Sequence, residues 1–272
     1  MSYAMSTNLD TNLTSNTPLS HDAIRHFVAP EECLQGKTIL VTGASAGIGR
    51  VAALTYARYG ATVLLLSRNI SKLEAVYDEI ENSGGKQPAI LPMDLETATY
   101  DEMRRLAKLI DTEFGQLDGV LHNAGILGQL TPLEMYDVDL FAKVMYVNAT
   151  ATFMLTQALL PLLKESDNGS IVFTSSTVGT HPRAFWGAYA LSKQTLEGMS
   201  DIFTQETQNT TNLRFNCINP GGTRTNMRAH AFPGENPMTL KTPEDIMSGY
   251  VCLMSDASIG VRGQVVALQP KD

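Results

Sequence analysis

The chain has 272 residues, of which 43% are hydrophobic, and it carries 20 Lys and Arg against 28 Asp and Glu, a net charge of −8. This size suffices for one large α/β domain, although length alone also allows two domains. The acidic balance argues against a surface that binds nucleic acid or anionic lipid.

The N-terminal residues, 1 to about 20, are rich in Ser, Thr, Asn and Asp and predict a mobile tail. They lack the basic and apolar regions of a signal peptide, and no apolar run of about 20 residues could span a bilayer. Three scattered cysteines, Cys33, Cys217 and Cys252, have no metal-ligand spacing and suit a reducing compartment. We therefore expect a cytoplasmic protein with no metal and no membrane contact.

Strands and helices alternate from residue 37 onward. Residues 37–43 predict a buried strand, 50–59 a helix and 61–66 a second strand, which together form a βαβ unit. Further helices are expected over 71–82, 101–114, 137–164, 188–208 and 243–254, and further strands over 88–92, 119–122, 169–174, 213–219 and 264–268. The pattern predicts a partly disordered N-terminal extension, residues 1–36, and one doubly wound Rossmann-type α/β domain, residues 37–272, with a mainly parallel seven-stranded sheet and helices on both faces.

Residues 225–242 interrupt this alternation with Pro233, Gly234 and Pro237. A compact sheet needs only a short connection there, and long irregular insertions in compact domains are often functional lids. We call residues 225–242 the lid and expect them to be irregular and to carry substrate specificity.

A glycine-rich turn follows the first strand, with Gly43, Gly47 and Gly49 in the spacing Gly-x-x-x-Gly-x-Gly. Glycines at a strand-to-helix turn let backbone amides approach a pyrophosphate at the positive end of the helix. An NAD site usually has an acidic residue at the end of the second strand, but Ser67 and Arg68 stand there. Because a guanidinium can bind a 2′-phosphate, NADP(H) is favoured over NAD(H) as the cofactor. The alternative is that Arg68 is a solvated loop residue with no role in binding.

Tyr189 and Lys193 lie four residues apart in a predicted helix, so both side chains share one face. The ammonium should stabilise the phenolate and lower the pKa of Tyr189 toward the range useful for general acid and base catalysis. Alone, this pair is more often a solvated helix face than a catalytic site. Whether the pair forms a catalytic site therefore depends on the surrounding motifs.

Further motifs are Asp94-Leu95, Asn123-Ala124-Gly125 and Pro220-Gly221 through Thr225, with Asn148 and Ser176 upstream of Tyr189. Together with Thr42–Gly49, and in this order and spacing, they resemble the short-chain dehydrogenase/reductase family over about residues 36 to 269. The resemblance implies a catalytic tetrad of Asn148, Ser176, Tyr189 and Lys193, with Ser176 chosen over Ser175 because it lies 13 positions before Tyr189. The cofactor contacts that it implies are Gly43, Ser45, Ala46, Gly47, Ile48, Gly49, Ser67, Arg68, Asp94, Leu95, Asn123, Ala124, Gly125, Tyr189, Lys193, Pro220, Gly221, Thr223 and Thr225.

Within the family, residues 121–125, 151–161 and 219–225 are most similar to the YciK-type bacterial oxidoreductases. Two positions depart from the common family pattern. His122 replaces a frequent Asn, in a position more structural than catalytic, and the chain ends Gln269-Pro-Lys-Asp instead of Asp-Gly-Gly. Family analogy implies a homodimer or homotetramer formed through the helices that begin near Asp137 and Ala188, while the ending puts the usual C-terminal contacts in doubt.

The resemblance implies hydride transfer between nicotinamide and a small carbonyl or alcohol, with Tyr189 as general acid and base. Lys193 would bind the nicotinamide ribose, Ser176 would orient the substrate oxygen, and Asn148 would hold a water that relays protons. A catalytically idle NADP-binding sensor or scaffold and a related epimerase or dehydratase remain alternatives. The presence of both Tyr189 and Lys193 argues against the first, and the glycine spacing argues against the second.

Overall fold

The computed structural model describes residues 18–270, which contain one sheet of seven parallel strands in the order β3-β2-β1-β4-β5-β6-β7. The expected doubly wound architecture is confirmed. The strand order reverses direction between β1 and β4, which in open α/β sheets creates a crevice at the carboxyl ends of the strands. The strands are β1 Thr38–Thr42, β2 Thr62–Ser67, β3 Ala89–Pro92, β4 Gly119–His122, β5 Ser170–Thr174, β6 Arg214–Asn219 and β7 Val265–Ala267.

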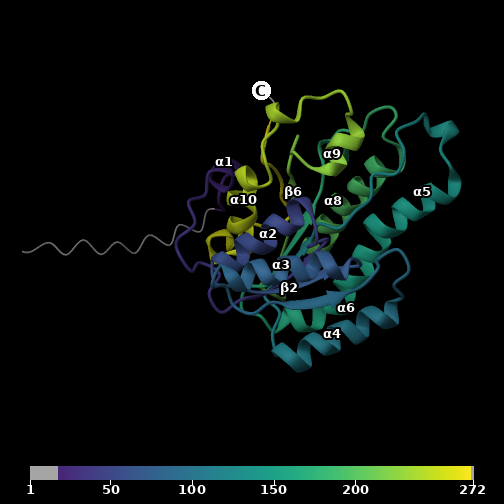
Figure 1. Cartoon of the computed structure of the whole chain (residues 1–272). Coiled ribbons are helices and arrows are strands. Elements are labelled where there is room, and N and C mark those ends of the chain that lie inside the picture. Colours follow the sequence, from purple (N-terminus) through teal and green to yellow (C-terminus); the bar gives the residue numbers. More distant parts are fainter. Residues whose placement is uncertain (1–17, 271–272) are drawn as a thin grey trace, which may run out of the picture.

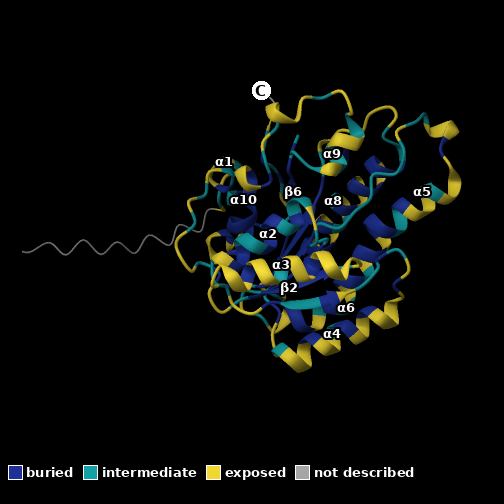
Figure 2. Cartoon of the chain, viewed as in Figure 1, coloured by how far each residue is buried: buried dark blue, intermediate teal, exposed yellow. Residues whose placement is uncertain are grey.

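Helices cover both faces of the sheet (Figure 1). One layer contains α2 Gly47–Arg58, α3 Ile70–Asn82 and α10 Met247–Met254, and the other contains α4 Tyr100–Phe114, α6 Ala151–Lys164 and α8 Gly187–Thr207. Successive side chains of β1 point to opposite layers, since Ile39 and Val41 pack with the first layer and Leu40 with the second. Both faces of the central strands are therefore buried, as Figure 2 shows.

The helix expected over residues 137–164 is continuous but changes its period in the middle. It consists of α5 Val138–Met145, a π-helical turn Tyr146–Thr150 and α6. A π turn inserts one extra residue and is frequent at functional sites. This turn carries Asn148, which is one of the predicted catalytic residues.

The segment before β1 packs onto the domain. Helix α1, His21–Arg25, begins at the N-cap Ser20, and its Ile24 is fully buried in the same core as α10. Leu34 is also fully buried, and Ser248 donates a hydrogen bond to the carbonyl of Arg25. The predicted tail falls almost wholly outside the described residues.

The lid contains more regular structure than expected. Residues Asn226–Ala231 form helix α9, which the side chain of Thr225 caps, and Pro237–Thr239 form a 3-10 turn. The prolines and glycine that suggested an irregular segment lie after α9 and leave residues 226–231 free to be helical. The remaining short elements are α7 Thr177–Thr180 and the 3-10 turns Leu133–Met135, Glu244–Ile246 and Asp256–Ser258.

Over residues 18–270, none of the helices is long and apolar enough to cross a membrane.

Candidate active site

Two pockets lie at the carboxyl ends of the strands, where the topology predicts a ligand site. The larger has a volume of about 450 Å³ and the smaller about 170 Å³. Gly43, Ala124 and Gly125 line both, so the two pockets form one elongated groove. Of the predicted site residues, all line this groove except Ser45, Gly49 and Asn148.

The glycine-rich turn forms the floor between the two pockets. Gly43 has φ +69° and Gly47 has φ +54°, a region that favours glycine. A β-carbon on Gly49 would overlap the Gly43 carbonyl oxygen, so this position admits no side chain. Ala46 is the N-cap of α2 and offers no side-chain cap, which leaves the first amides of the helix available to an anion.

The smaller pocket has the residues expected to surround the adenosine of a dinucleotide. Ser67 and Arg68 follow β2, and the Ser67 hydroxyl lies 2.9 Å from that of Ser45. The Arg68 guanidinium is exposed and lies 3.5 Å from Asp94 and 3.6 Å from Glu96. Lys143 on α5 pairs with the same Glu96 at 2.7 Å.

The Asn123-Ala124-Gly125 segment is positioned by Thr42, the first residue of the cofactor motif, which was not among the predicted contacts. The Thr42 hydroxyl accepts hydrogen bonds from the backbone amides of Asn123 and Ala124, both at 3.0 Å. Because Thr42 ends β1, this contact fixes the loop after β4 against the glycine turn. A threonine immediately before Gly43 is the signal that could have identified it.

The turn after β6 is held by hydrogen bonds from a residue near the C-terminus. Gly221 has φ +71°, and its amide donates to the Asn219 side chain at 3.0 Å. The Gln269 amide donates to the carbonyls of Pro220 at 2.8 Å and Gly222 at 3.2 Å. The unusual chain ending therefore supports the turn that carries Thr223 and Thr225.

Tyr189 and Lys193 lie on consecutive turns of α8, and both are almost fully buried. The Lys193 Nζ lies 5.6 Å from the centre of the Tyr189 ring. Burial raises the pKa of Tyr189 to about 12, and the nearby Ser176 hydroxyl opposes part of that rise. The expectation of a lowered pKa for Tyr189 is thus wrong, because burial disfavours the charged phenolate.

Lys193 is held by the sheet. Its ammonium donates a 2.6 Å hydrogen bond to the carbonyl oxygen of Thr174, the last residue of β5. Burial lowers the pKa of Lys193 to about 8. Thr174 was missed at the sequence level because a backbone carbonyl carries no residue signature.

Asn148 lies behind the groove, fully buried on the π turn. Its side chain accepts from the Ile126 amide at 2.8 Å and donates to the Ile126 carbonyl at 2.9 Å and to Ser192 at 3.0 Å. These bonds fix the loop after Gly125 to α8, one residue before Lys193.

The two adjacent serines have different environments. Both line the larger pocket, but Ser175 is buried and donates to Glu197 at 2.5 Å, whereas Ser176 is only partly buried and its hydroxyl lies beside Tyr189. His122 is buried in the second layer, stacked on Phe173 at 5.2 Å with its Nε2 2.9 Å from the Thr156 hydroxyl, and burial lowers its pKa to about 3. A neutral, buried imidazole is well suited to a structural role.

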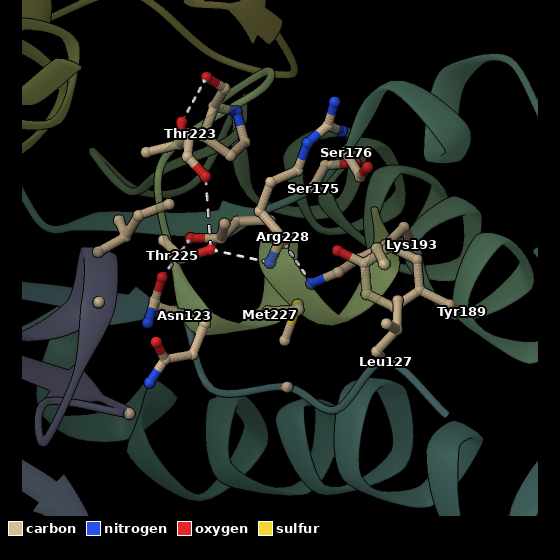
Figure 3. Close-up of a pocket in the computed structure, with 18 of the residues that line it drawn as sticks. Asn123, Leu127, Ser175, Ser176, Tyr189, Lys193, Thr223, Thr225, Met227 and Arg228 are labelled. Atoms are coloured by element: carbon tan, nitrogen blue, oxygen red, sulfur yellow. Dashed lines mark hydrogen bonds between the residues drawn. The ribbon is translucent and has the colours of Figure 1, made fainter. Parts of the chain in front are cut away.

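The lid forms the outer wall of the larger pocket. Figure 3 shows Met227 between the Thr223–Thr225 turn and the side that carries Tyr189, Lys193 and Leu127. Trp186 lies 5.9 Å from the Tyr189 ring and 5.7 Å from that of Phe232, measured between ring centroids. The aromatic contact between the start of α8 and the lid was not apparent from the sequence, since the two residues are 46 positions apart.

Among residues 18–270, no group of three His, Cys, Asp or Glu side chains is placed to hold a metal ion.

Comparisons with known proteins agree on one family. The sequence profile described as short chain dehydrogenase matches residues 37–236. The uncharacterised oxidoreductase YciK of Escherichia coli strain K12 is 54% identical over 245 residues, which are 90% of this chain and 96% of that protein. A crystal structure of a short chain dehydrogenase from Shigella flexneri complexed with NADP has 54% identity and a TM-score of 0.86, covering 89% of this chain and 100% of that one. One from Escherichia coli complexed with NADPH has 55% identity, the same TM-score and the same coverage.

Proposed function

The chain belongs to the short chain dehydrogenase family and is an oxidoreductase, and from this premise we propose that it uses NADP(H) to interconvert a carbonyl and an alcohol, with Tyr189 as the general acid and base. One observation carries this proposal. Tyr189, Ser176 and Lys193 line a single pocket together with Gly43 and Gly47 of the glycine-rich turn.

The groove fits NADP(H). Relatives of more than half identity were crystallised with NADP and NADPH. In this chain, the amides at the start of α2 suit the pyrophosphate, and the absence of a β-carbon at Gly43 and Gly49 leaves the backbone open to it. No carboxylate stands at Ser67 or Arg68 to repel a 2′-phosphate. Arg68 is exposed beside Ser67 and would exchange its long contacts with Asp94 and Glu96, at 3.5 and 3.6 Å, for the phosphate. When bound, the cofactor supplies or accepts the hydride.

The protein residues then move the proton. With a pKa of about 12, Tyr189 carries its proton near neutral pH and can donate it to the oxygen of a carbonyl that is being reduced. The adjacent Ser176 hydroxyl would orient the same oxygen.

Lys193 would bind the nicotinamide ribose and stabilise the phenolate that forms when Tyr189 gives up its proton. The hydrogen bond to the Thr174 carbonyl keeps the ammonium at the base of the pocket. Asn148, next to Ile126 and Ser192, would hold the water that returns a proton to Lys193.

We further propose a cytoplasmic homodimer or homotetramer. Exposed apolar side chains on α6 and α8, namely Phe153, Leu191 and Ile202, offer surfaces for packing of a second copy.

The experiment is an NADPH-oxidation screen over aldehydes, ketones and quinones, followed by Tyr189→Phe with the best substrate. We expect Tyr189→Phe to lower kcat by about 10²- to 10⁴-fold and to leave the NADPH dissociation constant unchanged, because only the proton donor is removed. Tyr100→Phe, which removes the hydroxyl of an exposed tyrosine outside the groove, is the matched control and should keep full activity. Retained turnover in Tyr189→Phe, or tight NADPH binding with no turnover of any compound, would refute the proposal.

A further inference from the structure

The wall of the larger pocket that faces Tyr189 is apolar and aromatic. Leu127, Trp186, Met227, Ala231 and Phe232 contribute it, from the loop after β4, the loop before α8 and the lid. Tyr189, Val178 and Ala190 pack in one cluster with Leu127, Trp186 and Met227. A substrate whose carbonyl reaches the Tyr189 hydroxyl must place its remaining atoms against this wall.

Aromatic rings form a row along the wall. The Trp186 ring makes a 51° angle with Tyr189 and a 40° angle with Phe232, so neither ring covers the other face to face. Trp186 and Phe232 are each only partly buried, and both line the pocket. The Arg183 guanidinium lies 4.9 Å from the centre of the Trp186 ring and that of Arg228 lies 3.7 Å from the centre of the Phe232 ring, so each ring has at most one free face. The remaining faces and edges favour a flat apolar partner, which can stack in offset or edge-to-face geometry.

Of the cations that line the pocket, Arg228 is already paired within the protein. Arg228 on α9 donates from Nε and Nη2 to the two carboxylate oxygens of Glu235, both at 2.6 Å, and its guanidinium lies 3.7 Å above the Phe232 ring. The Arg228 guanidinium also lowers the pKa of Glu235, so the pair is ionised at neutral pH. An anionic substrate group would have to displace Glu235 to use this cation.

The two other cations that line the pocket have partners as well. Arg224 donates to the carbonyls of Pro237 at 2.8 Å and Leu240 at 3.2 Å, within the lid, and its charge also acts on Asp245. Lys193 donates to Thr174. The pocket therefore combines a partly open aromatic wall with cations that, among its described lining residues, each have a hydrogen-bond partner, while Arg183, outside the lining, stacks on Trp186.

We propose that the substrate is an uncharged carbonyl compound, or the corresponding alcohol, with a flat apolar ring attached beside the reacting carbon. This inference rests on the proposed function, because it assumes that the carbonyl is reduced at Tyr189. Trp186 and Phe232 are the residues that select the ring, and the Arg228–Glu235 pair excludes carboxylate-bearing substrates.

Two matched substrate pairs test the class. Acetophenone and methyl hexyl ketone have the same number of carbons but differ in the ring, and para-methylacetophenone and para-acetylbenzoate differ mainly in charge. We expect kcat/KM with NADPH to be about tenfold or more higher for the first member of each pair, since ring contacts and desolvation of a carboxylate both act on the bound state. Equal or higher values for the aliphatic or anionic member would overturn the inference while leaving the proposed function intact.

Binding can be followed without turnover, because Trp186 is the only tryptophan in the chain. In the presence of NADP⁺, which blocks reduction, para-methylacetophenone should quench the tryptophan emission saturably. Phe232→Leu should raise the apparent Kd about three- to tenfold. The control is Tyr100→Leu, which alters an exposed aromatic on α4 outside the groove and should leave the Kd unchanged. Quenching that does not saturate, or that both variants weaken equally, would overturn the inference.

A separate variant tests the role of the Arg228–Glu235 pair. Glu235→Gln removes the carboxylate that holds Arg228 and should raise the kcat/KM ratio of para-acetylbenzoate to para-methylacetophenone at least threefold, because the freed guanidinium can pair with the substrate carboxylate. An unchanged ratio would show that Glu235 does not screen this site. If no carbonyl compound is reduced but the fluorescence titration behaves as expected, the proposed function fails and the ring-binding site stands.

Discussion

Replacing Lys193 by Met should stabilise the ligand-free protein near neutral pH, although it removes a residue of the proposed catalytic site. The Lys193 side chain is 3% exposed, and burial lowers its pKa from 10.5 to about 8. A depression of this size corresponds to about 3 kcal/mol of unfavourable free energy for keeping the ammonium charged in the folded protein. Loss of the hydrogen bond to the Thr174 carbonyl offsets about 1 kcal/mol of the gain, which leaves a net stabilisation of about 2 kcal/mol at pH 7.

The titration of Lys193 also predicts how the difference in stability between the two proteins changes with pH. Between the folded pKa of about 8 and the unfolded value of 10.5, the unfolded chain binds a proton that the folded chain has released. Unfolding free energy rises with pH wherever the unfolded state binds more protons, so the natural protein should gain stability through this window relative to Lys193→Met. The advantage of Lys193→Met should therefore shrink by about 2 to 3 kcal/mol between pH 7 and pH 10.

The assay is urea-induced unfolding of both proteins without cofactor at several pH values from 7 to 10, with Lys72→Met, which alters an exposed lysine on α3, as the control. A stability difference between the natural protein and Lys193→Met that does not change over this range would refute the reasoning. So would a Lys193→Met variant that is less stable than the natural protein at pH 7, because the cost of burying the charge would then be smaller than the contacts that the lysine makes.

Further predictions concern the cofactor groove. Gly49→Ala forces a β-carbon against the Gly43 carbonyl and should weaken NADPH binding by about tenfold or more in isothermal titration. The control is Gly198→Ala in α8, where a β-carbon meets no atom within 4 Å. It should leave NADPH binding unchanged and stabilise the fold by about 0.5–1 kcal/mol. Equal binding losses in both variants would contradict the assigned role of the glycine turn. Arg68→Gln should raise the Kd of NADPH about tenfold while that of NADH stays constant, since only NADPH carries the 2′-phosphate. Lys143→Met, which leaves Glu96 free to compete for Arg68, should act in the same direction by about two- to threefold, and a parallel loss of NADH affinity would count against both assignments.

The sequence by itself determined the architecture and the family. Short apolar strands alternating with amphipathic helices have few solutions other than a parallel sheet covered on both faces, and the glycine spacing after β1 restricts backbone geometry so strongly that it can be read as a motif. The boundaries of β1, β4 and α4 agree with expectation within one residue, because buried apolar runs, a capping Thr99 and a left-handed Gly115 mark them locally. NADP(H) as the cofactor, inferred from Ser67 and Arg68, agrees with the NADP and NADPH complexes of the relatives.

Other features depended on the tertiary structure. The pKa of Tyr189 is raised by burial under elements distant in sequence, an effect that the spacing of Tyr189 and Lys193 does not reveal. The lid residues 226–231 become helical under the Thr225 cap, and the adjoining Phe232 meets Trp186 only because the chain folds back across the pocket. Spacing along a helix records which residues share a face, but the free energy of a buried charge and the shape of a pocket are set by contacts between segments that the sequence keeps far apart.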